Sequence, residues 1–352
     1  MTTRTRPTVG RWLVATAVVT LVLAGCSSDD DGGSASDDPA GTTITTAGGD
    51  ADGTATTGTA TGPGSVEVAE RQVVVGDLTF DVWEAGPDDG ELVLLLHGFP
   101  QSKDSWAEVI EPLATAGYHV VAPDQRGYSP GARPVGDESY VITELVGDVT
   151  GMADALGADR FHVVGHDWGA AVAWTTAALA PERVLTVTGL SVPHPGAYAA
   201  AQADPTSGQL ESSGYVDTLV APDAPEALSA DGGAGIRLLL EASGLEGPSV
   251  DVFVERMADA PAAVDGAVAW YRANDLRSDL GGALPPVEVP ALFVWSTDDV
   301  AITQGAADRN ADFMAGPSTY EVLPGVSHWI PEQAPDEVVA LLLDHLADTA
   351  DG

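Results

Sequence analysis

Short apolar runs alternate with stretches of helical periodicity along most of the chain beyond residue 70. Gln72–Val75 and Phe80–Trp83 flank Gly76-Asp77, a pattern that predicts a β-hairpin. Leu92–Leu96 is a continuous apolar run, as expected for a strand that is buried on both faces of a sheet. Further short strands are predicted at His119–Ala122, Phe161–Val164, Val184–Leu190, Ala291–Trp295 and Thr319–Leu323.

Helices are predicted between these strands. One is expected from Ser105 to about Gly117, and apolar residues recur at helical spacing from Tyr140 to Leu156. The run Ala170–Ala180 and the amphipathic stretch Asp336–Leu346 predict two more. Strands that alternate with helices indicate an α/β fold with a mostly parallel central sheet flanked by helices.

The alternation stops after Leu190. Residues 191–284 are rich in Ala, Gly and Pro, with helix-like segments at Ile236–Ala242 and Val250–Met257, and the strand pattern then resumes. A helical insertion between two blocks of a parallel sheet is typical of a cap. We therefore expect the first part of a core at residues 66–190, a helical cap at 191–284, and the second part of the core at 285–352.

The N-terminal segment has the pattern of an export signal. Arg4, Arg6 and Arg11 precede the apolar stretch Trp12–Ala24, which is too short to span a bilayer comfortably. Leu23-Ala24-Gly25-Cys26 resembles the end of a bacterial lipoprotein signal, in which the cysteine is lipidated and becomes the mature N-terminus. The resemblance implies a signal peptide at residues 1–25 and a protein anchored through Cys26 to the outer face of the cell membrane. An ordinary secretory signal with an unmodified cysteine is the alternative.

The residues after Cys26 are expected to form a tether. Residues 26–65 consist mainly of Asp, Gly, Thr, Ser and Ala, which cannot bury enough apolar surface to offset the entropy of ordering. The formal net charge of the chain is −39, and Lys103 is its only lysine. This balance argues against nucleic acid and anionic lipid surfaces as partners. No metal-ligand spacing and no phosphate-binding glycine loop is present, so we expect no cofactor and no metal.

Gly165-His166-Asp167-Trp168-Gly169 follows a predicted strand and precedes a predicted helix. Strand, sharp turn and helix form the nucleophile elbow of α/β-hydrolases, usually written G-x-S-x-G, so the chain resembles that superfamily. Here Asp167 stands at the serine position. A carboxylate is already ionised at neutral pH and is better suited to displacing a leaving group from saturated carbon than to attacking an ester carbonyl. Asp167 therefore argues for epoxide opening or carbon–halogen cleavage through an alkyl-enzyme ester.

Such a nucleophile needs a base, an acid that orients the base, and donors for an oxyanion. His328 lies just after the last predicted strand, where this fold places its base, and Asp299 ends another strand. Asp298 is the alternative for the orienting acid. The backbone N–H groups of Phe99 and Trp168 are the expected oxyanion donors.

Together these motifs resemble the epoxide hydrolase branch of the superfamily. The resemblance depends on His97-Gly98-Phe99-Pro100, Asp124–Ser129, Gly165–Gly169 and Gly325–Trp329. Haloalkane dehalogenases usually have Asn where Phe99 stands, and fluoroacetate dehalogenases usually have Arg where Trp168 stands. Phe99 with Trp168 is the combination of epoxide hydrolases.

The resemblance also implies two tyrosines in the cap that donate protons to the epoxide oxygen. Trp270-Tyr271-Arg272-Ala273 resembles the cap segment W-Y-R-N, which makes Tyr271 the first candidate. Tyr215 is the second candidate and Tyr198 its rival. Trp168 is expected to line the substrate pocket, and Trp106 to line its floor or to pack in the core.

These observations predict a hydrolase that converts a small apolar epoxide to a diol. A haloalkane or haloacid dehalogenase that uses the same Asp167 is the first alternative. A capped binding lipoprotein without catalysis is the alternative from another class.

Overall fold

The computed structural model of the chain describes residues 66–258, 261–275 and 284–347. The predicted signal peptide and tether, with Cys26, lie outside the described residues. Within the described ranges, no helix is both long enough and apolar enough to cross a membrane.

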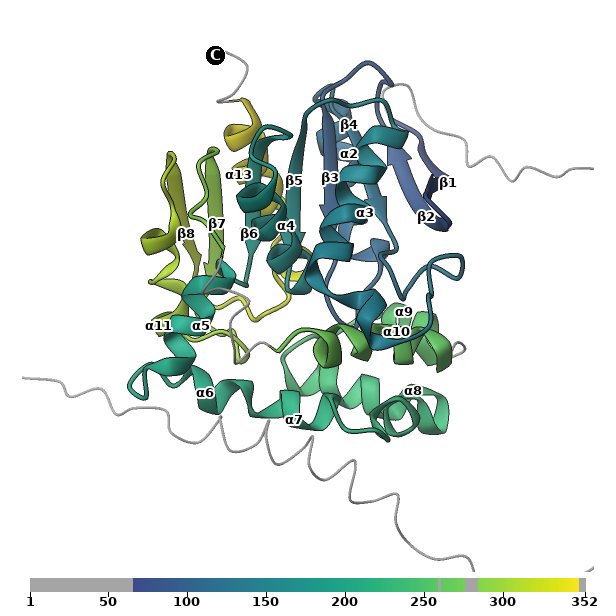
Figure 1. The fold of residues 1–352 in the computed structure, drawn as a ribbon, viewed down its shortest axis with the longest axis vertical. Helices are drawn as coiled ribbons and strands as arrows, with labels where there is room; N and C mark the ends of the chain where they lie inside the picture. The colour runs from purple at the N-terminus through teal and green to yellow at the C-terminus, as the bar shows by residue number, and fades with distance from the viewer. Residues whose placement is uncertain (1–65, 259–260, 276–283, 348–352) are drawn as a thin grey trace, which may run out of the picture.

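One eight-stranded sheet organises the described chain, in the order β1-β2-β4-β3-β5-β6-β7-β8 (Figure 1). Strands β1 and β2 pair antiparallel, as do β2 and β4, and the pairs from β4–β3 through β7–β8 are parallel. The prediction of a mostly parallel sheet is confirmed. The strands are β1 (Val68–Val75), β2 (Leu78–Ala85), β3 (Leu92–Leu96), β4 (His119–Pro123), β5 (Phe161–His166), β6 (Val184–Leu190), β7 (Ala291–Ser296) and β8 (Ser318–Leu323).

Helices cover both faces of this sheet. On one face, α3 (Ile142–Ala155) and α4 (Trp168–Leu179) share a core with Leu94 and Leu96 of β3. On the other face, α2 (Ile110–Thr115) and α13 (Pro335–Ala347) pack with Val93 and Leu95 of the same strand. Because successive side chains of a strand point to opposite faces, β3 is apolar at every position, as its sequence predicted.

The helix predicted from Ser105 to Gly117 is interrupted, and that prediction is wrong. The chain forms a 3-10 turn at Lys103–Trp106 and then α2 from Ile110. Pro112 has no N–H to donate to the carbonyl of Glu108, and its ring would clash with that carbonyl in a continuous helix. Pro112 is tolerated only in the first turn of a helix, so α2 begins two residues before it.

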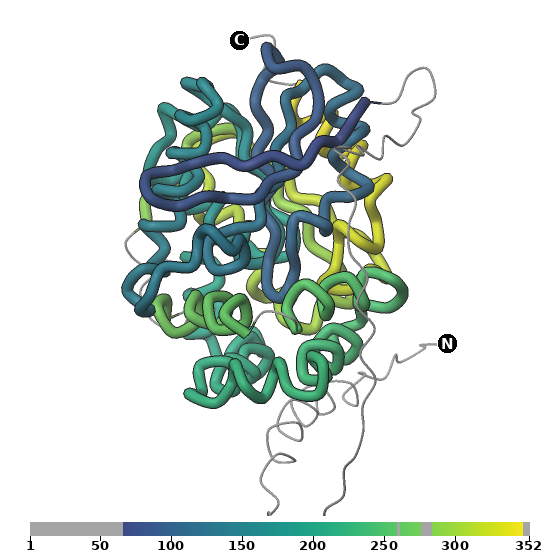
Figure 2. Tube along the Cα trace, turned by 90° about the vertical axis from the view of Figure 1, so that its right-hand side faces the viewer, coloured from purple at the N-terminus to yellow at the C-terminus, as the bar shows by residue number. Residues whose placement is uncertain are grey.

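Among the described residues, six α-helices lie between β6 and β7 along the chain: α5 (Pro195–Ala203), α6 (Gln209–Ser212), α7 (Val216–Leu219), α8 (Ala224–Ala242), α9 (Pro248–Ala258) and α10 (Pro261–Ala273). Figures 1 and 2 show α6 to α10 gathered at one end of the sheet. Phe99, just past the carboxyl end of β3, has its ring 5.3 Å from that of Tyr271 on α10. These helices therefore face the carboxyl ends of the parallel strands, where open α/β sheets bind ligands.

Candidate active site

Asp167 lies on the tight turn between β5 and α4. Its backbone has φ 53° and ψ −119°, a conformation that a residue with a side chain rarely adopts. Such a conformation costs on the order of 1–3 kcal/mol and persists only when the surrounding structure enforces it. The turn brings the Asp167 carboxylate to the end of the sheet, where 8 % of the residue remains exposed.

Two glycines permit this turn. A Cβ atom on Gly165 would lie 2.1 Å from the carbonyl oxygen of Gly169, and one on Gly169 would lie 2.1 Å from that of Leu96. Both distances are far below van der Waals contact. The glycines of the motif thus allow the strand, the turn and the helix to pack directly against one another and against β3.

His328 lies between two carboxylates. Its Nε2 atom is 3.3 Å from Oδ2 of Asp167, and its Nδ1 atom is 2.9 Å from Oδ2 of Asp299. The backbone N–H groups of Ala301 and Ile302 donate to the other oxygen of Asp299, at 2.8 and 2.9 Å. Asp299 is therefore held in place on both oxygens, and it orients the ring so that Nε2 faces Asp167.

Asp298, the alternative orienting acid, is exposed, and its backbone N–H donates to the carbonyl of Val326. Its side chain accepts from Thr297 at 3.3 Å. The structure thus brings Asp299, and not Asp298, to the imidazole.

The loop after β3 supplies a donor to Asp167. The backbone N–H of Phe99 donates to Oδ1 of Asp167 at 2.9 Å. A Cβ atom on Gly98 would lie 2.3 Å from Cβ of Asp167, so only glycine allows this approach. The backbone N–H of Trp168, at the first turn of α4, is the expected second donor, and its contribution stays a prediction.

The His97 side chain stabilises this loop through two hydrogen bonds to the backbone. Its Nδ1 atom donates to the carbonyl of Gly98 at 2.8 Å, and its Nε2 atom accepts from the backbone N–H of Gln125 at 3.1 Å. One neutral tautomer satisfies both bonds. Burial lowers the pKa of His97, which favours this neutral form.

Electrostatics couple Asp167 and His328. Burial opposes the charge of His328, but the charge of Asp299, with hydrogen bonds to Asp167 and Asp299, raises its pKa to about 10. Burial would also raise the pKa of Asp167, yet the hydrogen bond and charge of His328, together with the Phe99 N–H, lower it below its ordinary value. The resting pair is therefore a carboxylate beside an imidazolium.

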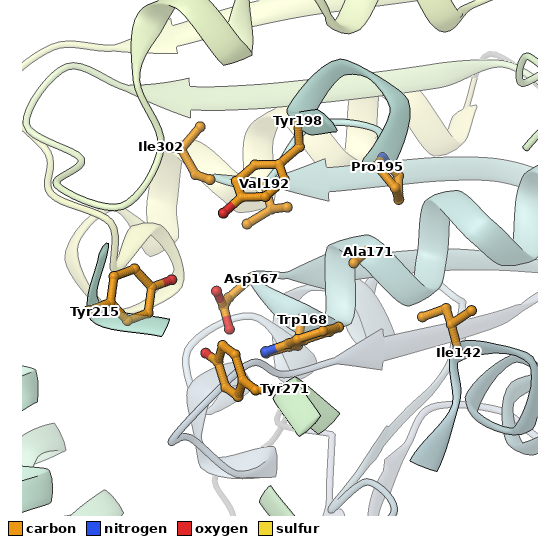
Figure 3. A pocket seen from close by; sticks show the side chains of 10 residues that line it. All are labelled: Ile142, Asp167, Trp168, Ala171, Val192, Pro195, Tyr198, Tyr215, Tyr271 and Ile302. Atoms are coloured by element: carbon orange, nitrogen blue, oxygen red, sulfur yellow. The ribbon is translucent and has the colours of Figure 1, made fainter. Parts of the chain in front are cut away.

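Tyr271 and Tyr215 share a cavity with Asp167. Figure 3 shows both hydroxyls directed toward the carboxylate, Tyr271 from α10 and Tyr215 from the segment Ser213–Tyr215. Burial, followed by the neighbouring tyrosines and the charge of Asp167, raises the pKa of both hydroxyls well above the ordinary value. Each hydroxyl therefore retains its proton at neutral pH and can donate it to an oxygen atom in the cavity.

Tyr198 lines the same cavity, but its hydroxyl proton is already donated in a hydrogen bond within the protein. The Ser213 hydroxyl donates its single proton to the carbonyl of Gln209 at 2.8 Å. The 2.6 Å contact between the Tyr198 and Ser213 hydroxyls therefore requires Tyr198 to be the donor. This bond leaves Tyr215 as the better second proton donor.

The two candidate pocket tryptophans have different positions. Trp168 lines the cavity and lies edge-on to Tyr271, with ring centroids 5.1 Å apart. Trp106 is fully buried among the residues of α2 and α13 on the opposite face of the sheet. The prediction that Trp106 lines the pocket floor is wrong, because the 3-10 turn at Lys103–Trp106 directs its side chain into that core.

A buried polar chain behind the site had no signal in the sequence analysis. The Gln101 amide oxygen accepts from the backbone N–H of Gly98 at 2.8 Å and faces Nδ1 of His166 at 2.8 Å, while its nitrogen donates to Glu332 at 2.7 Å. His166 continues the chain through Nε2 to the carbonyl of His328. Only the position of His166 beside Asp167 in the motif could have pointed to this chain.

No cluster of His, Cys, Asp and Glu suited to a metal ion occurs in the part of the chain that the structure describes. The arrangement instead combines a carboxylate, an imidazolium, a backbone donor and two phenols around an apolar cavity. Such a set can alkylate the carboxylate and then hydrolyse the ester.

Comparisons with known proteins agree with this architecture. Residues 91–335 match the family described as alpha/beta hydrolase fold. Epoxide hydrolase A of Mycobacterium tuberculosis (strain ATCC 25618 / H37Rv) is 34% identical over 316 residues, which cover 79% of this chain and 97% of the relative. The chain belongs to the α/β-hydrolase fold family, and epoxide hydrolases are among its relatives.

Solved structures of epoxide hydrolases resemble the whole described fold. The crystal structure of Epoxide Hydrolase A from Mycobacterium thermoresistibile has a TM-score of 0.61 and 30% identity, and the match covers 80% of this chain and 98% of that one. A mutant of an epoxide hydrolase from Bacillus megaterium, complexed with its naphthyloxy-propanediol product, has a TM-score of 0.71 and 26% identity, with 79% and 100% covered. The likeness therefore includes the cap as well as the sheet.

Proposed function

We propose that this protein is an epoxide hydrolase that forms an alkyl-enzyme ester on Asp167. The observation that supports this most strongly is the cavity in which Tyr215, Tyr271 and Asp167 meet. A proton donor opposite a carboxylate suits an epoxide, whose oxygen needs a proton as the ring opens. A halide leaving group has no such need. Relatives named epoxide hydrolases and a solved structure with a bound diol product add to the argument.

In the first step, Oδ2 of Asp167 attacks one ring carbon and the carbon–oxygen bond of that carbon breaks. Tyr271, assisted by Tyr215, donates a proton to the departing oxygen. The phenolate then recovers its proton from the His328 imidazolium. The products of this step are a hydroxyalkyl ester of Asp167 and a neutral His328.

In the second step, His328 removes a proton from water, and the hydroxide adds to the ester carbonyl of Asp167. The oxyanion forms on Oδ1, where the N–H of Phe99 already donates at 2.9 Å. The ester bond breaks, the diol leaves with a proton from His328, and the restored Asp167 carboxyl returns a proton to the imidazole. The net reaction adds one water to the epoxide.

Single-turnover hydrolysis in ¹⁸O-labelled water tests this proposal. Label should enter the Asp167 side chain, since water attacks the ester carbonyl and not the alkyl carbon. Intact-mass spectrometry of a His328→Gln variant should detect the trapped ester, and Asp167→Asn should neither trap nor turn over the epoxide. Halide release from haloalkanes without diol formation from epoxides would favour a dehalogenase, and binding without either reaction would favour a non-catalytic lipoprotein.

We also propose that the protein is exported and anchored by lipid at Cys26. The supporting observation is the order of basic residues, apolar stretch and small residues before the single cysteine. Lipidation with two or more acyl chains would give stable anchoring. Metabolic labelling with palmitate should label the wild type in the membrane fraction, and a Cys26→Ser variant should lose both the label and the membrane association.

A further inference from the structure

The cavity around Asp167 has two lobes that meet at the reacting groups. Asp167, Tyr215 and Tyr271 line both lobes. The walls of the Ile142 lobe also include Ile142, Ala171, Val192, Pro195 and Ile302. The walls of the Leu239 lobe also include Leu239, Ala242, Ser243, Val300 and Trp329. Figure 3 shows the Ile142 lobe extending away from the three shared side chains along α4.

This arrangement fixes where the substituents of an epoxide can lie. The attacked carbon must face Asp167 while the ring oxygen faces the two phenols. The substituents of the two ring carbons then point away from each other, and two lobes with different walls meet at the three shared side chains. Each additional methylene group of a substituent that is buried against such a wall strengthens substrate binding roughly fourfold. A terminal epoxide would leave one lobe without an apolar occupant.

The chemistry of the walls defines the substituents. Among the described residues that line the Ile142 lobe beyond the three shared side chains, the one hydroxyl is that of Tyr198, which is hydrogen-bonded to Ser213. Two serine hydroxyls, those of Ser212 and Ser243, line the Leu239 lobe, and Ser243 donates to the carbonyl of Leu239 and accepts from the indole of Trp329. Apart from Asp167 and His328, the described residues that line the two lobes have no charged side chain.

We infer that the substrates are internal epoxides with an uncharged, apolar substituent on each ring carbon, the products of oxidising internal alkenes. This inference depends on the proposed epoxide hydrolase function and names its substrate class. The two lobes are both required for such a substrate, whereas a terminal epoxide needs one of them.

A matched pair of substrates tests the inference. Trans-stilbene oxide has a phenyl group on each ring carbon, and styrene oxide has one phenyl group. We expect the wild type to hydrolyse trans-stilbene oxide with a kcat/KM at least about tenfold higher than that for styrene oxide, because the second ring fills the second lobe.

Filling one lobe should remove this preference. Ala171→Leu places a larger side chain in the Ile142 lobe, and Ala242→Leu does so in the Leu239 lobe. Each variant should lower kcat/KM for trans-stilbene oxide by about tenfold and for styrene oxide by less than about threefold, since the single ring can use the open lobe. Ala200→Leu, at an exposed position of α5, is the control and should change neither value.

The possible outcomes test the inferred substrate class and the proposed epoxide hydrolase function independently. Equal or better hydrolysis of styrene oxide by the wild type would overturn the inference and leave the epoxide hydrolase proposal intact. Failure of both epoxides to react, with no ester trapped in His328→Gln, would instead count against the proposed function. If a leucine variant does not fold, product inhibition decides: the diphenyl diol should inhibit the wild type more strongly than the monophenyl diol, and the reverse order would overturn the inference.

Discussion

Nε2 of His328 lies 3.3 Å from Oδ2 of Asp167, so the proposed base and the proposed nucleophile form an ion pair in the resting site. With Asp299 on the other nitrogen, this pairing raises the pKa of His328 to about 10 despite its burial. A cationic imidazole cannot accept a proton from water. Ester formation resolves this difficulty, because it neutralises Asp167 and removes one of the charges that stabilise the cation.

The pKa of His328 should therefore fall when Asp167 loses its charge. Asp167→Asn imitates the neutral ester, so in this variant we expect the pKa of His328 to lie below that of the wild type. NMR titration of the His328 ring checks this expectation. Asp298→Asn removes an exposed charge that does not contact the ring, and it should leave the titration nearly unchanged. An identical titration in Asp167→Asn would contradict the coupling.

The two neighbouring aspartates after β7 should differ sharply on substitution. Asp299→Asn removes the charge that faces Nδ1 of His328 and favours the wrong tautomer of the ring. We expect the ester hydrolysis step to slow by roughly 10²- to 10⁴-fold, as for comparable changes in other triads. Asp298→Asn should stay within about threefold of the wild type. Single-turnover kinetics would show the difference, and equal losses in the two variants would refute the assignment of Asp299.

Substitutions of the three cavity tyrosines should have different effects, on ring opening for Tyr271 and Tyr215 and on stability for Tyr198. Tyr271→Phe and Tyr215→Phe each remove a proton donor, and ring opening should slow by roughly 10²-fold or more. Tyr198→Phe removes a proton that is already donated to Ser213, so ring opening should change little. The free energy of unfolding should instead fall by about 1 kcal/mol. Rapid-quench measurement of ester formation and denaturant unfolding would distinguish these effects, and slow ring opening in Tyr198→Phe would contradict the assignment.

Local motifs explain which features could be predicted from the sequence. Gly165 and Gly169 are required by close backbone contacts, Asp167 follows β5 directly, and His328 lies in the loop after β8, so short-range patterns locate them. Trp106 shows the limit of this reasoning. Its helical neighbourhood was visible in the sequence, but the residue lies in a 3-10 turn before α2 and its indole packs in the core on the other face of the sheet.

Contacts between distant segments could not be predicted in the same way. The Tyr198 hydroxyl depends on Ser213 and Gln209, and Gln209 in turn accepts from the backbone N–H of Thr303 at 2.9 Å. No periodicity or motif relates these positions. The choice between Tyr198 and Tyr215 therefore required the packing of the cap against the loop after β7.

Glu332, on α12 (Ile330–Gln333), has a buried carboxyl oxygen without a hydrogen-bond partner among the described residues. Its other oxygen accepts from Gln101 at 2.7 Å. Burial raises the pKa of Glu332 from 4.5 to about 7, against the opposing effect of the neighbouring Ser105 hydroxyl, the backbone and the Gln101 amide. The folded state therefore binds this proton more tightly than the unfolded chain does.

This difference predicts how stability depends on pH. Between pH 4.5 and about 7 the folded protein holds the Glu332 proton that the unfolded chain releases, so stability falls as pH rises through this window and stays lower above it. Glu332→Gln keeps an acceptor for Gln101 and does not ionise. The free energy of unfolding of the variant, minus that of the wild type, should increase by on the order of 2 kcal/mol from pH 5 to pH 8. The difference in Tm between the two proteins should therefore increase by several degrees over the same range. Glu337→Gln, at an exposed position of α13, should show no such pH-dependent gain. A Tm difference between Glu332→Gln and the wild type that is the same at both pH values would show that the carboxyl of Glu332 is ionised in the folded protein across this range.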